Sequence, residues 1–291
     1  MTDFALTASD SGRVWFITGT SSGFGRVLAE SVLAAGDRVV ATARDVTTVS
    51  DLAEREPQRV VAVPLDVTDP ATVDDAVERA IATFGQIDVL VNNAGRGMIG
   101  ALEELTDEQT RAVLDTNVFG VLAVTRAVLP HMRSRRHGHI VQISSVGGVV
   151  GNPGHAIYAT SKFALEGMSE ALAGEVGPLG IRVTIVEPGP FRTDFAGRSM
   201  TYADPIPDYA DTPAGKLRTA FTQQDGVQPN DPARAATAIM RVVSDDAAPL
   251  RLPLGPEAVS RIREKLQRQL ADLDRWESVS IDTRYLTVEP T

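Results

Sequence analysis

The 291-residue sequence contains no cysteine. A disulfide framework, a thiol nucleophile and a cysteine metal site are therefore excluded. Basic residues are in deficit, because 28 Lys and Arg face 38 Asp and Glu for a net charge of −10. That balance argues against generic nucleic-acid binding. No uninterrupted apolar run approaches the roughly 20 residues of a transmembrane helix, so we expect no membrane span.

The N-terminus, MTDFALTASDSG, lacks the basic segment and apolar core of a secretory signal peptide. Together with the missing cysteines, this favours a cytoplasmic location. The four histidines show no carboxylate cluster at metal spacing, so we expect no metal site. His155 lies three residues before Tyr158 and is expected to be a partly exposed loop residue, with substrate contact as the alternative.

Short apolar runs alternate with helical periodicity along most of the chain. The alternation predicts one α/β domain, a doubly wound Rossmann-type fold with a mainly parallel central sheet. Runs that are apolar on both faces are typical of buried parallel strands. Helix-end signals lie between them, such as Asp69 before Pro70 and the capping-box pair Thr106 and Gln109. The predicted strands are Arg13–Thr18, Arg38–Ala43, Val60–Leu65, Val89–Asn92, His139–Ser144, Ile181–Glu187 and Leu250–Leu254.

Two regions depart from this alternation. Residues 190–230 are rich in proline and aromatic residues, and a long irregular segment of this kind predicts a lid. Residues 256–291 predict a C-terminal helical extension whose apolar stripe packs on the body or on another subunit. The core of the single domain, residues 1–291, then falls at about 13–189 and 231–255.

A glycine-rich stretch, TGTSSGFG, separates the first predicted strand from the first predicted helix. Gly19 permits a sharp turn off the strand. Gly23 and Gly25 let a pyrophosphate approach the backbone N–H groups at the positive end of the helix. A tight turn without a ligand is the alternative, but the strand–turn–helix placement favours nucleotide binding.

The spacing TGxxxGxG resembles that of the short-chain dehydrogenase/reductase family, and further motifs follow in the family's order over about residues 13–196. The segments VVATARD and VEPGPFRTDF and the long C-terminal extension resemble its hydroxysteroid and retinol dehydrogenase-like branch. The further motifs are NNAG ending at Gly95, Asn117 in LDTNVFG, ISS ending at Ser145, YATSK from Tyr158 to Lys162, and PGPFRT from Pro188 to Thr193.

Tyr158 and Lys162 are four residues apart and share one face of a predicted helix. A lysine ammonium beside a phenol lowers the phenol pKa from about 10, so Tyr158 can exchange a proton with an alcohol or carbonyl oxygen. A surface Tyr–Lys pair is the alternative. Ser145 ends a central strand, where open α/β sheets place their ligand crevice, and its hydroxyl can donate to a developing alkoxide. Ser144 competes for that role, but the thirteen-residue spacing to Tyr158 favours Ser145.

The family resemblance implies roles for these residues. Tyr158 is then the general acid in reduction and the general base in oxidation, Ser145 polarises the substrate carbonyl, and Lys162 holds the nicotinamide ribose. Asn117 anchors a water that links Lys162 to solvent; an Asn bonded to backbone is the compatible alternative. Subunit contacts in dimers or tetramers form through the helices that hold Asn117 and Tyr158. The resemblance also implies cofactor contacts by Tyr158, Lys162, Gly19, Ser21, Ser22, Gly23, Phe24, Gly25, Arg44, Asp66, Val67, Asn93, Ala94, Gly95, Pro188, Gly189 and Thr193.

The second predicted strand ends in Ala43 and Arg44, where NAD enzymes place a carboxylate for the adenosine ribose. A guanidinium there can bind a 2′-phosphate, so we predict NADP(H) rather than NAD(H). Two features point the other way. Ser22 stands where many phosphate-preferring relatives carry a basic residue, and Asp45 can pair with Arg44.

The sequence therefore predicts an NADP(H)-dependent oxidoreductase that transfers a hydride between nicotinamide and an apolar ketone or secondary alcohol. A non-catalytic NADP-binding sensor on the same fold is the alternative. Epimerisation or dehydration is disfavoured, because such relatives usually carry GxxGxxG at the first turn. The residues expected to give an apolar pocket are Met98, Ile99, Val146, Val149, Phe191, Phe195 and the lid aromatics.

Overall fold

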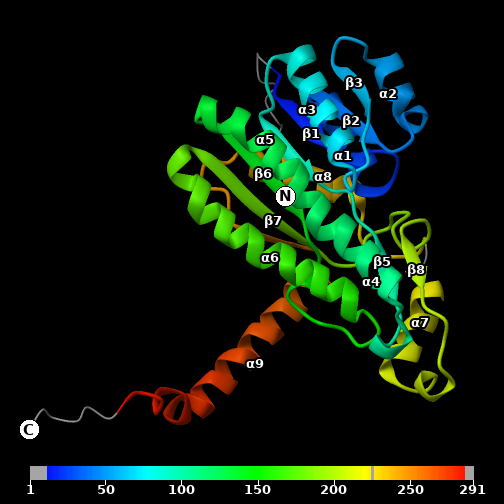
Figure 1. The fold of residues 1–291 in the computed structure, drawn as a ribbon, viewed down its shortest axis with the longest axis vertical. Helices are drawn as coiled ribbons and strands as arrows, with labels where there is room; N and C mark the ends of the chain where they lie inside the picture. Colours follow the sequence, from blue (N-terminus) through cyan, green and yellow to red (C-terminus); the bar gives the residue numbers. More distant parts are fainter. Residues whose placement is uncertain (1–11, 224–225, 286–291) are drawn as a thin grey trace, which may run out of the picture.

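The computed structural model describes residues 12–223 and 226–285 (Figure 1). Its centre is a seven-stranded parallel sheet in the order β3-β2-β1-β4-β6-β7-β9. Each strand begins and ends within one residue of its predicted bounds, and the predicted fold is confirmed. The strands are β1 (Val14–Ile17), β2 (Arg38–Ala43), β3 (Val60–Pro64), β4 (Val89–Asn92), β6 (Gly138–Ile143), β7 (Ile181–Pro188) and β9 (Arg251–Leu254). The N-terminal residues 1–11 lie outside the described part.

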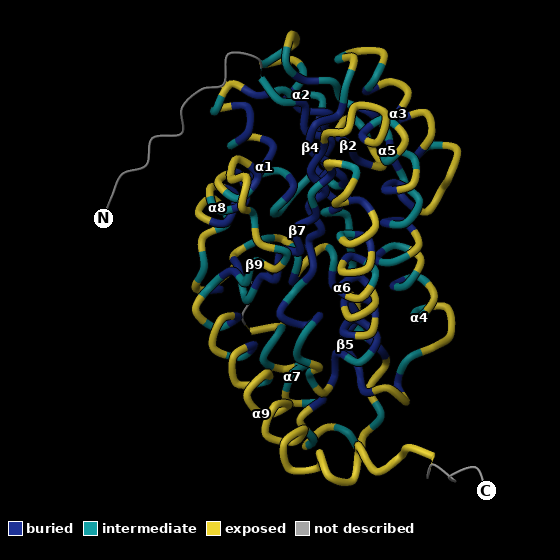
Figure 2. Tube along the Cα trace, turned by 90° about the vertical axis from the view of Figure 1, so that its left-hand side faces the viewer, coloured by how far each residue is buried: buried dark blue, intermediate teal, exposed yellow. Residues whose placement is uncertain are grey.

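Side chains of β1 alternate between two cores, one on each face of the sheet. Trp15 and Ile17 pack with helices α1 (Gly23–Ala34), α2 (Ser50–Arg55) and α8 (Pro232–Ser244). Val14 and Phe16 pack with α3 (Pro70–Phe84), α5 (Val121–Arg135) and α6 (Ala156–Val176). Figure 2 shows the strands buried between helices whose outer faces are exposed. The sheet is covered on both sides, as its apolar strands require.

The predicted helix ends are present in the structure. Asp69 accepts a hydrogen bond from the Ala71 amide at 3.0 Å, with Pro70 as the first helical residue. Thr106 and Gln109 form the capping box at the start of α4 (Asp107–Leu114). These short-range bonds satisfy amides that a helix N-terminus leaves free.

Helix α4 continues through a π-helical turn, η3 (Asp115–Gly120), into α5. By length and composition this stretch, Asp107–Arg135, could cross a membrane, with a mean hydropathy of 1.5 in its most apolar window. The sequence analysis counted only uninterrupted apolar runs and so did not identify this stretch; the expectation of no membrane span stays a prediction. Val121, Val124 and Val128 of the stretch are buried, as in a core helix.

Residues 190–230 hold more regular structure than predicted. Strand β8 (Met200–Tyr202) pairs in parallel with β5 (Gly97–Ile99) in a small second sheet that the sequence analysis did not predict. Helix α7 (Pro213–Gln223) follows it, and α9 (Pro256–Ile281) then projects away from the body (Figure 1). The short 3₁₀ turns are η1 (Val46–Val49), η2 (Leu102–Glu104), η4 (Val146–Gly148), η5 (Gly177–Leu179) and η6 (Pro207–Tyr209).

Candidate active site

A cavity of about 530 Å³ opens at the carboxyl ends of the central strands, beside β1 and β4, where the strand order reverses. Open α/β sheets bind their ligands at this position. Ser145, Tyr158 and Lys162 line the cavity, whereas Asn117 and Gly25 do not. The predicted cofactor residues that line it are Gly19, Ser21, Ser22, Gly23, Phe24, Arg44, Asp66, Val67, Asn93, Ala94, Gly95, Pro188, Gly189 and Thr193.

The three glycines of the first turn serve two different needs. Gly19 (φ +71°) and Gly23 (φ +57°) have left-handed backbone conformations that favour glycine. At Gly25 an added Cβ would lie 2.3 Å from the Gly19 carbonyl oxygen and 2.4 Å from Nδ2 of Asn93. The absence of a side chain at Gly25 therefore lets α1 pack closely on the turn, and its contact with a pyrophosphate stays a prediction.

Asn93 braces the glycine turn from β4. Its Nδ2 donates to the carbonyl oxygens of Thr18 at 2.8 Å and Gly19 at 2.9 Å, and its amide donates to Thr18 Oγ1 at 2.9 Å. The turn is therefore held from two strands before any ligand arrives, which lowers the ordering cost of binding.

The end of β2 presents Arg44 to the cavity. Asp45 does not pair with it, because Oδ1 of Asp45 accepts bonds from the Thr47 amide and hydroxyl and caps η1. Asp66 forms a similar turn through Thr68. Burial opposes the shift, but these bonds and the charge of Arg44 hold the pKa of Asp66 below its usual value. The Arg44 cation thus lies at the end of β2, where dinucleotide-binding folds hold the adenosine ribose.

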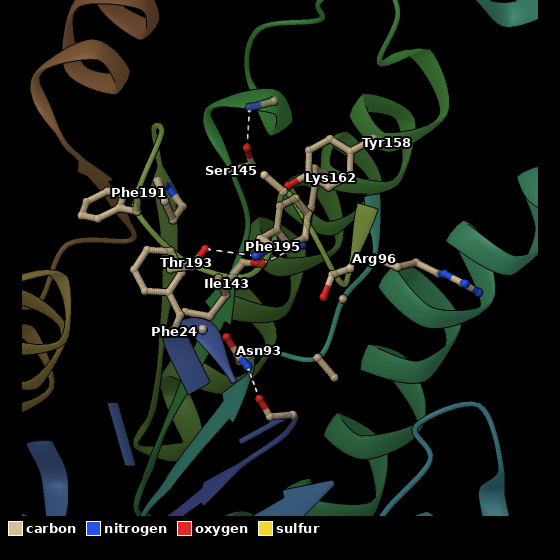
Figure 3. A pocket seen from close by; sticks show the side chains of 18 of the residues that line it. Phe24, Asn93, Arg96, Ile143, Ser145, Tyr158, Lys162, Phe191, Thr193 and Phe195 are labelled. Carbon is tan, nitrogen blue, oxygen red and sulfur yellow. Dashed lines mark hydrogen bonds between the residues drawn. The ribbon is translucent and has the colours of Figure 1, made fainter. Parts of the chain in front are cut away.

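Ser145 and Tyr158 meet on one side of the cavity, with Lys162 beside them (Figure 3). Oγ of Ser145 accepts a bond from the Gly147 amide at 2.9 Å, and the Ser145 hydroxyl acts to lower the pKa of Tyr158. Tyr158 is buried, with its ring 5.8 Å from that of Phe195. Ser144 also lines the cavity, but its Oγ is buried from solvent, whereas Ser145 influences the pKa of Tyr158, which favours Ser145 as the substrate-polarising serine.

The pKa of Tyr158 differs from the sequence-based expectation. Burial raises it to about 12, and the Ser145 hydroxyl opposes that shift only in part. Nζ of Lys162 lies 5.9 Å from the centre of the Tyr158 ring and donates to the Ile143 carbonyl at 2.8 Å. Burial also lowers the pKa of Lys162 to about 8, against the attraction of Glu166. In the protein without a bound cofactor, desolvation of Tyr158 therefore affects its pKa more than the charge of Lys162 does.

Asn117 lies behind the cavity, in the π-helical turn. Its Oδ1 accepts from the Arg96 amide at 2.9 Å, and its Nδ2 donates to the Arg96 carbonyl at 2.9 Å and to Ser161 Oγ at 3.0 Å. The Asn117 side chain thus bonds to backbone, which was the alternative interpretation of this residue. The water that it was expected to anchor stays a prediction. Asn117 joins the NNAG loop to α6. A π-helical turn inside an α-helix often marks a functional position.

His155 was expected to be partly exposed, and that expectation is wrong. Its exposed fraction is 7%, its ring centre lies 5.6 Å from that of Tyr158, and within the described chain its Nε2 has no hydrogen-bond partner. Burial lowers its pKa to about 4, so the ring is neutral at neutral pH. The residue lines the cavity, while its Nε2 is buried from solvent.

A group of charges behind Lys162 was not predicted. Nε of Arg251 lies 3.2 Å from Glu166 and 3.6 Å from Glu187. Burial, with the charge of Glu166, raises the pKa of Glu187 to about 7. Glu166 follows Lys162 by four residues on α6, a spacing that could have identified it.

The substrate side of the cavity is less apolar than predicted. Val146, Phe191, Phe195 and Phe221 line it, but so do Arg96, Arg198 and Arg261. Of the other expected residues, Met98 packs in a separate cluster, Val149 packs near the start of α9, and Ile99, Tyr202 and Tyr209 are absent from the lining. In the described part of the chain, no group of three or more metal-ligating side chains is present.

Comparison with known proteins agrees with this geometry. Residues 13–202 match the family model described as short chain dehydrogenase. The chain is 38% identical to "Oxidoreductase BOA17" of Botryotinia fuckeliana, over 92% of this chain and 98% of that protein. A solved short-chain dehydrogenase from Streptomyces avermitilis superposes with a TM-score of 0.89 at 44% identity, over 95% of this chain and 100% of the other.

A second solved structure carries a nicotinamide. It is the 3-ketoacyl-(acyl-carrier-protein) reductase of Brucella melitensis complexed with NADH, with a TM-score of 0.71 and 29% identity over 84% of this chain and 98% of that one. The chain belongs to the short-chain dehydrogenase family and is a nicotinamide-dependent oxidoreductase acting on the CH–OH/C=O group.

Proposed function

We propose that the protein is an NADP(H)-dependent reductase of ketones, with Ser145, Tyr158, Lys162 and Asn117 as its working residues. The observation that carries the proposal is that Ser145, Tyr158 and Lys162 line the same cavity as the glycine turn. The natural substrate is a largely apolar ketone, in keeping with Phe191, Phe195 and Phe221 in the lining.

The residues of the cavity fit a dinucleotide. The turn at Gly19 and Gly23 and the N-terminus of α1 would hold its pyrophosphate, and Arg44 would bind the adenosine 2′-phosphate. The nicotinamide supplies the hydride to the carbonyl carbon. A Cβ at Gly95 would lie 3.3 Å from Asn117 Oδ1, a tight contact, and 3.7 Å from Lys162 Nζ.

Ser145 and Tyr158 then act on the carbonyl oxygen. Both hydroxyls donate to it, and Tyr158 transfers its proton as the carbon accepts the hydride, so the ketone gains one hydride and one proton. A pKa of about 12 keeps the Tyr158 phenol protonated at neutral pH and suits it to this donation. Lys162 stabilises the phenolate that remains. In alcohol oxidation the same groups run in reverse, at a cost set by that high pKa.

Replacement of Tyr158 by Phe tests the proposal. We expect turnover of apolar ketones to fall about 10²–10⁴-fold, because the proton donor is lost. NADPH affinity, measured by nicotinamide fluorescence, should stay close to that of the unchanged protein. Tyr209→Phe is a matched control, since Tyr209 bonds Glu103 outside the cavity. Full activity in Tyr158→Phe would refute the assignment, and NADPH binding without turnover on any ketone or alcohol would favour a sensor.

Arg44 carries the cofactor preference. In Arg44→Ala we expect kcat/KM with NADPH to fall about 10- to 100-fold, since a charge-assisted bond to the 2′-phosphate is lost. The value with NADH should change little, and Arg44→Lys should keep part of the preference. The Brucella melitensis relative is complexed with NADH, so the preference here rests on Arg44. A higher kcat/KM with NADH in the unchanged protein would contradict it.

We further propose a cytoplasmic homodimer or homotetramer. Phe119 on η3 and Phe163 on α6 are 60% and 46% exposed, and they lie on the helices through which the family resemblance implies subunit contacts. Burial of such residues favours association. Light scattering on the eluting protein would measure the assembly.

A further inference from the structure

Helix α9 meets the body only at its base. Ala258 and Ile262 are buried against Val146 and its neighbours Val149 and Val150. From residue 263 to residue 285 every side chain except that of Lys265 is exposed. The helix has 26 residues and is about 39 Å long, and most of it stands clear of the body (Figure 1).

The free part of α9 carries an apolar stripe. We call Leu266, Leu270, Leu273 and Trp276 the outer stripe; they are 55%, 59%, 61% and 54% exposed. Their spacings of four, three and three residues place them on one helix face. That face continues the one on which Ile262 is buried. The outer stripe therefore extends the face that packs on the body at Ile262, but the body of the same chain does not cover it.

Charge along the helix is divided into two blocks. Residues 261–268 hold four cations and one carboxylate (net +3), and residues 272–277 hold three carboxylates and one cation (net −2). At 100° per residue, Arg263 flanks the outer stripe on the same side as Asp274 and Glu277. Lys265 flanks it on the other side, as does Asp272.

We propose that α9 pairs in antiparallel fashion with α9 of a second copy of this chain, outer stripe against outer stripe. In an antiparallel pair each flank faces the same flank of its partner. Arg263 then lies beside Asp274 of the partner subunit, and Lys265 lies beside Asp272 of the partner subunit. A parallel pair would place the two cationic blocks together, and like charges side by side are repulsive. The outer stripe is thus covered by α9 of the second copy, which runs in the opposite direction.

Because the chain has no cysteine, single introduced cysteines report the pairing without background. Arg263→Cys and Asp274→Cys are to be oxidised separately and as a mixture, at low concentration. The antiparallel pair gives a disulfide-linked dimer that joins the two variants in the mixture, and little from either alone. Self-linked dimers of each variant alone, at the yield of the mixture, would show random collision, and no cross-link in the mixture would show a parallel pair or no pair; either result overturns the proposal.

A charge exchange provides the second test, read by sedimentation velocity at low salt. Arg263→Asp with Lys265→Asp should weaken the α9 association about tenfold or more, since two attractive contacts per chain become repulsive. Adding Asp272→Lys and Asp274→Lys in the same chain should restore it. Arg268→Asp, on the far side of the helix from the outer stripe, is the control and should change nothing. Folded variants, shown by unchanged circular dichroism and NADPH binding, that lose association and do not regain it would overturn the proposal.

Discussion

Gly25 makes contacts that no larger residue can make. A Cβ at this position would overlap the Gly19 carbonyl and the Asn93 amide, and both of these are held by the turn. Gly25→Ala should therefore lower the free energy of unfolding by about 1–3 kcal/mol and weaken NADPH binding, because the turn must shift to admit the methyl group.

Urea unfolding and nicotinamide fluorescence would measure both effects. Gly174→Ala is a suitable control, since Gly174 is an exposed glycine of α6 and an added Cβ meets nothing within 4 Å. There a small gain in stability of about 0.5–1 kcal/mol is expected. Equal behaviour of the two variants would contradict the close packing inferred at Gly25.

Glu187 introduces a pH dependence of stability. It is 1% exposed, and burial raises its pKa to about 7 from the usual value near 4.3. The folded state then holds a proton that the unfolded state has lost, so the penalty is absent below about pH 4 and complete above about pH 7. Glu187→Gln should therefore raise the free energy of unfolding more at pH 8 than at pH 5, by about 1–3 kcal/mol.

The measurement is urea unfolding of parent and variant at both pH values, so that other titrating groups cancel. Glu170→Gln changes the exposed carboxylate partner of Arg251 and serves as the control. A variant of Glu187 that shows the same pH dependence as its parent would mean that the carboxyl is not protonated in the folded state near neutral pH.

At the scale of elements, the segment predicted as a lid meets the catalytic helix through aromatic rings. The Phe221 ring of α7 lies edge-on to His155, with centres 5.0 Å apart, and His155 in turn lies against Tyr158. Gly154 has φ +83° and leaves room for Ala214 of α7, whose Cα lies 3.1 Å from where a Cβ would be. The loop before α6 is thus shaped to receive α7.

Phe221→Ala should raise KM for apolar ketones about tenfold, because a ring that borders the substrate space is lost. NADPH affinity should remain, since the glycine turn and Arg44 are untouched. Leu102→Ala, which removes a side chain that is 72% exposed and outside the cavity, is the control. An unchanged KM would show that α7 does not contact the substrate.

The elements that the sequence predicted well are those with local signals. The inner strands β1, β4 and β6 are short runs buried on both faces, and caps such as Asp69 and Thr106 act within three residues. Strands β5 and β8 have three residues each and pair across about a hundred positions, so no local pattern indicates them. The π-helical turn at Asn117 depends on the bonds to Arg96 and Ser161, which are contacts of the folded chain.

At the scale of the whole molecule, the site also divides into residues with a local sequence signal and residues that only the folded chain brings together. Motif residues such as Gly19, Ser145 and Tyr158 could be located, because their spacing along the chain is characteristic. Buried Glu187 and exposed Arg251 come from neighbouring strands 64 positions apart, and only the pairing of β7 with β9 brings them together. The predicted lowering of the Tyr158 pKa was wrong for a related reason, because burial, which raises this pKa, is a property of the folded protein.

The two outer strands of the sheet each carry a proline, Pro64 in β3 and Pro253 in β9. Leu65 and Leu254 bond inward to Ala43 and Gly189, so their neighbours Pro64 and Pro253 present their backbone outward. Proline has no N–H to donate at that edge. Each border is therefore a poor template for strand addition, which protects the protein from edge-to-edge aggregation and leaves self-association to its helices.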